Sequence, residues 1–217
     1  MPDPKKILIT AGPTREMLDP VRFLSNLSTG EMGYTLAQSA RDKGYRVTLI
    51  SGPASRRAPS GVKFVPVVSA ADLMSACKRY FPSHSVLIMT AAVCDFTFLN
   101  PKTHKIRRAK TKEIFLKQTP DIVAHLASRK GNRLVIGFCL ETRDWLRNAR
   151  QKLKKKRLDG IVANFYTPRH VPFGRQKITA AFIDRRGRTQ LLKSQTKKQL
   201  SARLLHWIDA LKINSDT

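Results

Sequence analysis

Residues 7–53 constrain the possible fold more strongly than any other part of the sequence. A short apolar run at residues 7–9 is followed by a long loop, by a helical pattern that begins near Gly30, and by a second apolar run at residues 47–50. This order of strand, loop, helix and strand is typical of the βαβ unit of a parallel sheet. The loop is longer than such a connection requires. Because ligands of open α/β sheets bind beyond the carboxyl ends of the strands, this loop is a candidate for ligand binding.

Apolar runs and helical patterns alternate along the rest of the chain. Further strands are predicted at residues 62–68, 86–89, 113–117, 134–138 and 161–164, and helices at residues 31–43, 70–81, 119–131, 145–156 and 197–213. Residues 177–184 and 189–193 flank a basic turn that contains Gly187, so they predict a β-hairpin. We therefore expect one domain, residues 1–217, with a Rossmann-like three-layer αβα fold, a mostly parallel central sheet and an antiparallel hairpin near the C-terminus.

Three local signals refine this prediction. Pro66 favours a position near the sheet edge for its strand, because proline cannot donate a backbone hydrogen bond to a neighbour. Ser69 is expected to cap the helix that follows it. Thr119, Pro120 and Asp121 predict the start of another helix, with a capping residue, a proline at the first helical position and an acid in the first turn.

The charge of the chain is extreme, with 41 Lys and Arg residues against 15 Asp and Glu residues and a formal net charge of +26. Such a charge favours anionic partners, which include nucleotides, phosphorylated metabolites, nucleic acids and anionic membrane surfaces. A basic bias shared by all proteins of the host explains it equally well, because the excess is spread along the whole chain. With 41% hydrophobic residues, the chain has enough apolar side chains to bury a core.

The cysteine and histidine residues do not form a recognisable metal-binding or disulfide pattern. Three cysteines lie far apart and the five histidines are scattered, so no zinc site is predicted. A reducing cytoplasm is the simplest setting for three such cysteines. The N-terminus has no apolar segment typical of a signal peptide, and no apolar run is long enough to span a membrane. We therefore expect a cytoplasmic protein.

Several motifs occur in an order that resembles the phosphopantothenate–cysteine ligase family. They lie at residues 9–16 (ITAGPTRE), 19–23, 25–26, 28–30, 32–33, 91–95, 105–108, 119–122, 137–142 and 161–164. The first motif is long and specific, and the resemblance covers about residues 5–205.

This resemblance implies a ligase of coenzyme A biosynthesis that joins 4′-phosphopantothenate to cysteine. A nucleoside triphosphate, CTP or ATP, activates the carboxylate as an acyl-nucleotidylate with release of pyrophosphate, and Mg²⁺ is expected as a cofactor. The resemblance also implies a homodimer in which a loop at residues 100–112 closes as a flap on the neighbouring subunit's site. No segment resembles the flavin-dependent decarboxylase often fused to such ligases, so a stand-alone ligase with a separate decarboxylase is expected.

The resemblance also assigns roles to individual residues. The catalytic positions are Asn26, which would hold the acyl-nucleotidylate, and Lys105, which would stabilise the departing pyrophosphate. The nucleotide-binding positions are Gly12, Ser28, Thr29, Gly30, Gly33, Ala92, Asp95, Lys105 and Phe138, and Asp95 would also hold Mg²⁺ through water. The substrate-binding positions are Arg15, Arg22, Asn26 and Arg107.

Each assignment has a structural alternative. Asn26 is equally suited to capping a turn, and Phe138 to ordinary core packing. Arg15 and Arg22 have acidic neighbours with which they could form structural pairs, and Lys105 lies in a loop of solvated cations.

The sequence departs from the family pattern after the strand predicted at residues 161–164. Phe165 stands where the family usually has aspartate, and the loop at residues 171–177 is basic where the family's loop is glycine-rich and acidic. The choice between CTP and ATP stays open. A nucleic-acid-binding protein is an alternative that rests on the charge and on basic clusters at residues 102–117 and 143–157, although no recognised motif supports it. A nicotinamide-dependent oxidoreductase is disfavoured, because the glycine fingerprint is incomplete and no acid ends the second strand.

Overall fold

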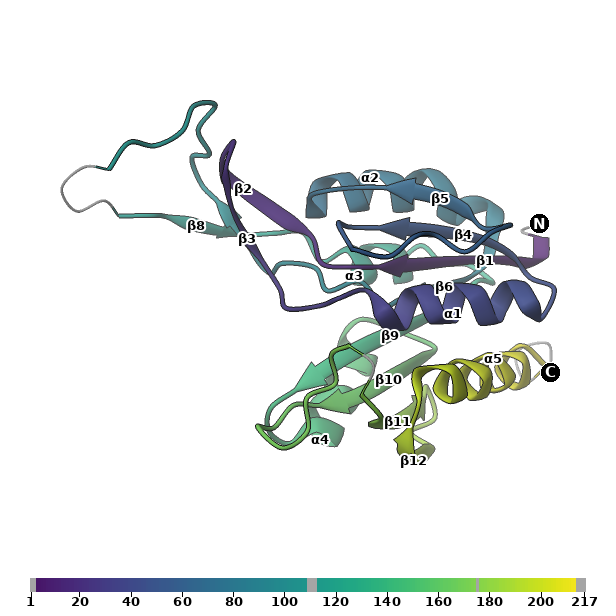
Figure 1. Ribbon diagram of the computed structural model, residues 1–217. Coiled ribbons are helices and arrows are strands. Elements are labelled where there is room, and N and C mark those ends of the chain that lie inside the picture. The colour runs from purple at the N-terminus through teal and green to yellow at the C-terminus, as the bar shows by residue number, and fades with distance from the viewer. Residues whose placement is uncertain (1–2, 109–112, 175, 214–217) are drawn as a thin grey trace.

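The computed structural model describes residues 3–108, 113–174 and 176–213, and its centre is an eight-stranded mixed sheet (Figure 1). The strand order is β12-β11-β10-β9-β6-β1-β4-β5. β11 runs antiparallel to both of its neighbours, β10 and β12, and all other neighbouring pairs in this sheet run parallel. The strands are β1 (Asp3–Ala11), β4 (Arg46–Ser51), β5 (Lys63–Pro66), β6 (His84–Met89), β9 (Leu134–Glu141), β10 (Gly160–Phe165), β11 (Ile178–Asp184) and β12 (Thr189–Gln195). The expected Rossmann-like fold with a C-terminal hairpin is confirmed.

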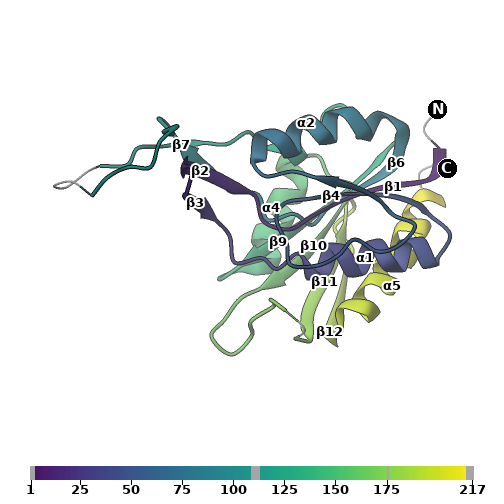
Figure 2. The ribbon, with the colours of Figure 1, turned by 45° about the horizontal axis from the view of Figure 1, so that its top comes forward.

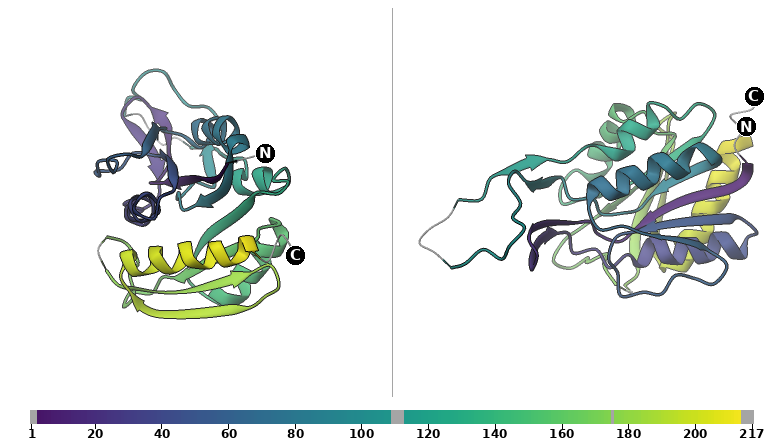
Figure 3. Two further views of the ribbon diagram at one scale, coloured as in Figure 1. Left: turned by 90° about the vertical axis from the view of Figure 1, so that its right-hand side faces the viewer. Right: turned by 90° about the horizontal axis from the view of Figure 1, so that it is seen from above.

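Helices cover both faces of the sheet (Figures 2 and 3). They are α1 (Glu31–Asp42), α2 (Ala70–Tyr80), the short 3₁₀ helix η1 (Phe81–Ser83), α3 (Ile122–Ala127), α4 (Trp145–Lys155) and α5 (Lys197–Ile213). One core layer contains apolar side chains of α1 and α5, and the other contains those of α2, α3 and α4. The apolar run of β6 lies between β1 and β9 and is buried on both faces, which explains its continuous hydrophobic pattern.

Two of the three local signals are confirmed. β5, which ends at Pro66, is an edge strand. Ser69 caps α2 in a capping box, because its hydroxyl accepts a hydrogen bond from the Asp72 amide while the Asp72 carboxylate accepts one from the Ser69 amide. The Asp72 carboxylate therefore accepts a hydrogen bond from a backbone amide that has no acceptor within the helix.

The predicted start of the helix at residues 119–131 is wrong. The helix is shorter, Ile122–Ala127, and its cap is Asp121, whose carboxylate accepts a hydrogen bond of 3.1 Å from the Ala124 amide. The Thr119 hydroxyl instead donates to the carbonyl oxygen of Cys94, and its amide donates to that of Asp95 at 2.9 Å. These tertiary contacts hold the backbone before Pro120 outside the helix.

Two hairpins were not predicted from the sequence. β2 (Arg15–Asp19) pairs with β3 (Arg22–Ser25) inside the long loop after β1, and β7 (Phe96–Phe98) pairs with β8 (Leu116–Gln118). The strand expected at residues 113–117 therefore begins later, at Leu116. Both hairpins project from the carboxyl edge of the sheet and form an arm (Figure 1). Their apolar side chains are largely exposed, so no alternating burial pattern marks these strands.

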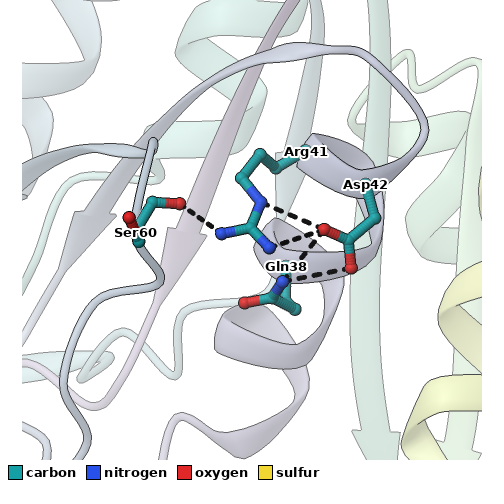
Figure 4. Close-up of polar contacts among 4 residues, drawn as sticks. All are labelled: Gln38, Arg41, Asp42 and Ser60. Carbon is teal, nitrogen blue, oxygen red and sulfur yellow. Dashed lines mark hydrogen bonds and ion pairs between the residues drawn. The ribbon is translucent and has the colours of Figure 1, made fainter.

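The loop between β4 and β5 is fastened to the last turn of α1 (Figure 4). The Arg41 guanidinium donates to the Ser60 carbonyl oxygen and also to the Asp42 carboxylate. Hydrogen bonds from Gln38 and then from Arg41 hold the pKa of the Asp42 carboxyl below its usual value. Among the described helices, none combines the length and apolar character needed to cross a lipid bilayer.

A buried histidine links β6 to β4. The His84 side chain places Nδ1 2.6 Å from the Tyr80 carbonyl oxygen and Nε2 2.9 Å from the Thr48 hydroxyl oxygen. The carbonyl can only accept, so Nδ1 donates and Nε2 accepts from Thr48 in the neutral ring. Burial lowers the pKa of His84, and the nearby cations Lys6 and Lys63 lower it further against the opposing effect of the Tyr80 carbonyl.

This histidine is expected to make folding stability depend on pH. Below about pH 6.5, the ordinary pKa of a histidine side chain, the unfolded chain binds a proton that the folded chain does not, so the free energy of unfolding falls as the pH falls. His84→Gln should flatten this slope in urea unfolding measured between about pH 7.5 and pH 5.5. His206→Gln, on the exposed side of α5, is the control and should keep the wild-type slope. Equal slopes for wild type and His84→Gln would contradict the assignment.

Candidate active site

A large cleft opens where the strand order reverses. The chain leaves β1 toward β4 on one side, whereas β6 leads to β9 on the other, so the carboxyl ends of β1 and β6 flank a topological switch point. A cleft of about 800 Å³, here called the main cleft, lies beside these ends. Its wall comprises residues 26–28, 89–96, 118–123, 137–140, 152–161 and Phe173, with gaps within some of these ranges. A cavity of about 190 Å³, here called the side pocket, shares Ser28, Ala92 and Phe138 with it.

Glycines allow the turns beside the cleft to pack closely against neighbouring backbone. Gly12 and Gly30 have φ angles of +71° and +75°, which glycine adopts without strain. A Cβ on Gly12 would lie 2.7 Å from the Gly52 carbonyl oxygen. A Cβ on Gly33 would lie 2.5 Å from that of Ala11 and 2.6 Å from the Thr90 hydroxyl, so this glycine lets α1 pack against β1. The resulting geometry directs the N-terminus of α1 into the side pocket, which suits an anion.

Asn26 and Ala92 are connected through the backbone at the end of β6. The Ala92 amide donates to the Gly12 carbonyl oxygen at 2.9 Å, and the Ala92 carbonyl oxygen accepts from the Thr14 amide at 3.1 Å. The same carbonyl accepts a hydrogen bond of 3.0 Å from Nδ2 of Asn26. This bond fixes the amide orientation of Asn26 at the rim of the main cleft and leaves its Oδ1 available to a ligand.

The main cleft brings together many of the residues that the family resemblance assigned. Asn26, Ser28, Ala92, Asp95 and Phe138 all line it. Thr29 and Gly30 line the side pocket. Gly12 and Gly33 do not line it, but they allow the backbone behind its wall to pack closely. Phe138 is half-buried and is exposed to both cavities, so core packing describes its position only in part.

Two lysines in the main cleft were missed in the sequence analysis. Lys152 and Lys156 of the α4 region lie four residues apart, so both face the cleft. The Lys156 ammonium lies 3.0 Å from the carboxylate of Asp121, and that of Lys152 lies 2.6 Å from the carboxylate of Glu141. Burial alone lowers the pKa of Lys152, but the hydrogen bond and negative charge of Glu141, together with smaller effects of Cys139 and Asp95, outweigh it and leave the pKa raised. The four-residue spacing was the available signal, hidden among the other cations of this basic helix.

A third missed lysine lies in the side pocket. Lys197, at the start of α5, is buried, and its ammonium donates to the carbonyl oxygens of Gly174 and Gln176. Burial lowers the pKa of this lysine, and the nearby Glu31 carboxylate opposes that effect. Lys197 therefore ties the loop after β10, which carries Phe173, to the wall of the pocket. No sequence pattern distinguished it from its neighbour Lys198.

The arm projects from the carboxyl edge of the sheet (Figures 1 and 3) and carries the remaining assigned residues, none of which lines the main cleft. Lys105 is exposed on the arm and is not part of the cleft wall of its own chain. Arg22 and Arg107 line a separate cavity of about 400 Å³ between the two hairpins. The guanidinium of Arg15 lies 4.4 Å from the centre of the Phe23 ring. Residues 109–112, which complete the expected flap at 100–112, lie outside the described residues.

Asp19, at the turn of the β2–β3 hairpin, fastens the segment around Ile106 to that hairpin. Its carboxylate accepts hydrogen bonds from the amides of Val21, Arg22 and Ile106 at 2.9 to 3.1 Å and forms an ion pair of 3.1 Å with Arg22. Desolvation raises the pKa of Asp19, but the three amides and the Arg22 cation together outweigh it, so the pKa is lowered. Arg22 also donates to the Ile106 carbonyl oxygen at 3.0 Å. The ion pair of Arg22 with Asp19 is the structural alternative that the sequence analysis considered for this arginine.

Asp19→Asn is expected to loosen residues near Ile106 from the β2–β3 hairpin. If the arm takes part in catalysis, kcat should fall about tenfold while the melting temperature changes little, because the bonds lost are local to the arm. Steady-state kinetics and a thermal melt check this together. Asp42→Asn removes a carboxylate at the far end of α1 and should leave kcat unchanged. A loss of kcat shared by both variants would contradict a specific role for Asp19.

The described residues hold no group of three or more His, Cys, Asp or Glu side chains that could bind a metal ion. Asp95 is exposed on the main cleft, and the other carboxylate in the cleft wall, Asp121, is paired with Lys156. Mg²⁺ commonly keeps several waters and binds through one or two carboxylates together with substrate phosphates, so Asp95 is compatible with it.

The fold and the cleft together define a Rossmann-like α/β protein with a candidate ligand site at the switch point of the sheet. Residues 3–211 match the family described as the DNA/pantothenate metabolism flavoprotein C-terminal domain. The chain belongs to this family.

Curated relatives and solved structures agree with that membership. The coenzyme A biosynthesis bifunctional protein CoaBC of Bacillus subtilis is 42% identical over 212 residues, which is 95% of this chain and 52% of that protein. The Escherichia coli K12 protein of the same name is 43% identical over 163 residues, 73% of this chain and 40% of that protein. This chain thus spans about half the length of these relatives or less.

Among solved structures, the C-terminal domain of CoaBC superposes with a TM-score of 0.84 at 35% identity and covers 98% of both chains. A Cab2 mutant in complex with phosphopantothenate-cysteine superposes with a TM-score of 0.77 at 17% identity, covering 98% of this chain and 89% of that one. The second likeness concerns the fold alone.

Proposed function

We propose that this protein joins 4′-phosphopantothenate to L-cysteine in coenzyme A biosynthesis. The observation that carries the proposal is the convergence of Asn26, Ala92, Asp95 and Phe138 in one cleft at the switch point of the sheet. Two lysines, Lys152 and Lys156, add positive charge to the same cleft. Family membership and relatives named for coenzyme A biosynthesis support the same reaction.

The proposed reaction has two steps. A carboxylate oxygen of 4′-phosphopantothenate attacks the α-phosphorus of CTP or ATP, and pyrophosphate departs with the electrons of the broken P–O bond. The cysteine amine then attacks the acyl carbon, and the nucleoside monophosphate leaves as the amide forms and the amine loses a proton. Both steps need phosphate charge to be neutralised and reactants to be aligned, rather than covalent work by the protein.

The residues divide this work between binding and orientation. In the proposal, Asn26 uses its free Oδ1 and its fixed amide to orient the acyl-nucleotidylate. Phe138 and the Ala92 backbone flank the base, and the turns at Ser28, Thr29 and Gly30 present N–H groups to phosphate, while Gly12 and Gly33 permit the close approach. Asp95 holds the ribose, or Mg²⁺ through water.

The arm is proposed to act on a neighbouring subunit in a homodimer. Exposed apolar side chains on the two hairpins, including Phe23 at 45% and Phe115 at 60% exposure, support a second copy as the partner of this surface. Lys105 would then reach the partner's cleft, where it binds the triphosphate. Arg15, Arg22 and Arg107 would bind the anionic groups of 4′-phosphopantothenate, since guanidinium groups match phosphate and carboxylate geometry.

A phosphopantothenoylcysteine decarboxylase is proposed to act on the product. The curated relatives are named as bifunctional proteins, and one 38% identical relative is named cysteine/cysteine sulfinic acid decarboxylase. The chain covers 58% of that decarboxylase and about half of the bifunctional relative from Bacillus subtilis.

Pyrophosphate release tests the proposed function. Purified protein is incubated with 4′-phosphopantothenate, Mg²⁺ and either CTP or ATP, with and without cysteine, and the products are identified by mass spectrometry. We expect release that depends on 4′-phosphopantothenate, and phosphopantothenoylcysteine together with CMP or AMP when cysteine is present. Asn26→Ala should abolish release, whereas Asn132→Ala, on an exposed loop, should not. Folded wild-type protein that releases no pyrophosphate with either nucleotide would refute the proposal and leave nucleic-acid binding to be tested.

A further inference from the structure

Glu141 and Thr142 lie at the end of β9 and belong to one of the motifs that resemble the ligase family, but the proposed function gives them no role. Glu141 is the last residue of β9 and lies in register with Phe165 of β10. Its carbonyl oxygen accepts a hydrogen bond of 2.8 Å from the Tyr166 amide, so its backbone is fixed between two neighbouring segments. The two residues before it, Cys139 and Leu140, line the main cleft, whereas Glu141 itself does not.

The Glu141 carboxylate is held by α4. One oxygen lies 2.6 Å from the Lys152 ammonium, and the other accepts a hydrogen bond of 3.2 Å from Nδ2 of Asn148. Asn148 and Lys152 are four residues apart, so both project from the same face of α4 toward β9. Asn148 also donates to the Arg143 carbonyl oxygen at 3.0 Å, which fixes the amide that orients the carboxylate.

Burial differs sharply between the two partners of this ion pair. The Glu141 side chain is 14% exposed, whereas the Lys152 side chain is 44% exposed and lines the main cleft. The carboxylate therefore lies behind the ammonium as seen from the cleft. A buried carboxylate is costly unless it is paired, so this arrangement restrains a long, flexible lysine to one direction.

We propose that Glu141 is a positioning residue that holds the Lys152 ammonium at the wall of the main cleft, directed toward the anionic part of the nucleotide. This inference rests on the proposed function, because it takes the main cleft to be the nucleotide site. Glu141 acts through Lys152 and does not touch the ligand itself.

The charge of Lys152 depends on the groups that face it. Glu141 and Cys139 approach it from β9, Asp95 approaches from the loop after β6, and Lys156 lies one helical turn away. Burial acts to discharge the lysine, and the Glu141 carboxylate is the strongest group that opposes this effect. Without that carboxylate, the burial effect would dominate and Lys152 would lose its proton at a lower pH.

A double-mutant cycle on nucleotide binding tests the inference. Binding of CTP and ATP is measured by calorimetry for wild type, Glu141→Gln, Lys152→Met and the double variant at about pH 7 and pH 9.5. Glu141→Gln should weaken binding about tenfold at neutral pH, as expected for one charge-assisted hydrogen bond that no longer orients the ammonium. Between the two pH values, binding should weaken further in Glu141→Gln but not in wild type. In the Lys152→Met background, Glu141→Gln should have almost no effect.

Asp209→Asn is the matched control, because Asp209 also pairs with a lysine, Lys43, but lies away from the main cleft. It should bind nucleotide as wild type does. Circular dichroism shows whether each variant is folded. If Glu141→Gln does not fold, Glu141→Asp, which keeps the charge, replaces it in the cycle. Equal effects of Glu141→Gln with and without Lys152 would overturn the inference, since they would indicate a purely structural role.

The titration of the Lys152 ammonium separates this inference from the proposed function. It is followed by NMR in the absence of any nucleotide, with Lys152→Met used to assign the signal. We expect the pKa of Lys152 to fall in Glu141→Gln, and an unchanged titration would overturn the inference whatever the protein catalyses. Wild-type protein that binds neither nucleotide would instead refute the proposed function, with the pKa shift still showing that Glu141 holds the ammonium.

Discussion

Replacing Lys105 with alanine is expected to lower kcat by about 10²- to 10³-fold, the usual loss when one group that stabilises developing charge is removed. The physical reason is that a primary ammonium on the arm would neutralise pyrophosphate as it departs. Lys105 is exposed, so the melting temperature should stay the same. Pyrophosphate release measured under saturating nucleotide checks the prediction. Lys193→Ala, an exposed lysine on β12, is the control and should keep full activity.

Mixing inactive variants tests whether the arm serves the neighbouring subunit. Asn26 lies in the main cleft, whereas Lys105 lies on the arm, so Asn26→Ala and Lys105→Ala would damage different parts of one shared site. After unfolding and refolding together, half of the dimers are mixed and each has one intact site, so about a quarter of wild-type activity should return. No recovery from a mixture shown to contain mixed dimers would mean that each arm serves its own subunit.

Gly52→Ala is expected to destabilise the protein by about 3 kcal/mol and to abolish activity, because overpacking against backbone cannot be relieved by a side-chain rotation. A Cβ at this position would lie 1.9 Å from the Pro13 carbonyl oxygen and 2.8 Å from its carbonyl carbon. The Gly52 amide also donates to the Ala11 carbonyl oxygen at 3.0 Å, so the residue cannot simply retreat. Displacing Pro13 would disturb its pairing with Ala92 at the cleft. Chemical unfolding and the activity assay measure the two effects.

Gly137→Ala provides the comparison for that prediction. Its Cβ would also be too close to a neighbour, but that neighbour is Cδ1 of Leu158 at 2.7 Å, the end of a flexible side chain. We expect a loss of about 1 kcal/mol, because Leu158 has space to adjust. A loss as large as that of Gly52→Ala would show that backbone contact is not what makes Gly52 sensitive.

The candidate site was predictable where the family motifs are dense. Asn26, Ser28, Ala92, Asp95 and Phe138 were assigned from the sequence and lie along one cleft. The position of Lys105 followed from the same motifs, but nothing in the sequence indicates that the arm would carry it away from its own cleft. The apolar residues on the arm show no periodicity from which its strands could be predicted, because they are exposed rather than directed at the core of the chain.

The missed residues share a physical cause. Lys152, Lys156 and Lys197 belong to a chain with 41 basic residues, so composition alone cannot separate a cleft lysine from a solvated one. What distinguishes them is a partner from another element, such as Glu141 of β9 for Lys152. Partners of this kind are brought together only when helices pack against the sheet.

By itself, the sequence determined which segments form the strands of the main sheet and most helices, including α5 at residues 197–213, since these elements arise from local periodicity and apolar burial. It also determined the family. Only the tertiary structure decided which residue caps α3, how the two hairpins pair, and which cations enter the main cleft. Those outcomes depend on hydrogen bonds and ion pairs between segments far apart in the chain, such as Asp19 with Ile106, and no local pattern encodes such contacts.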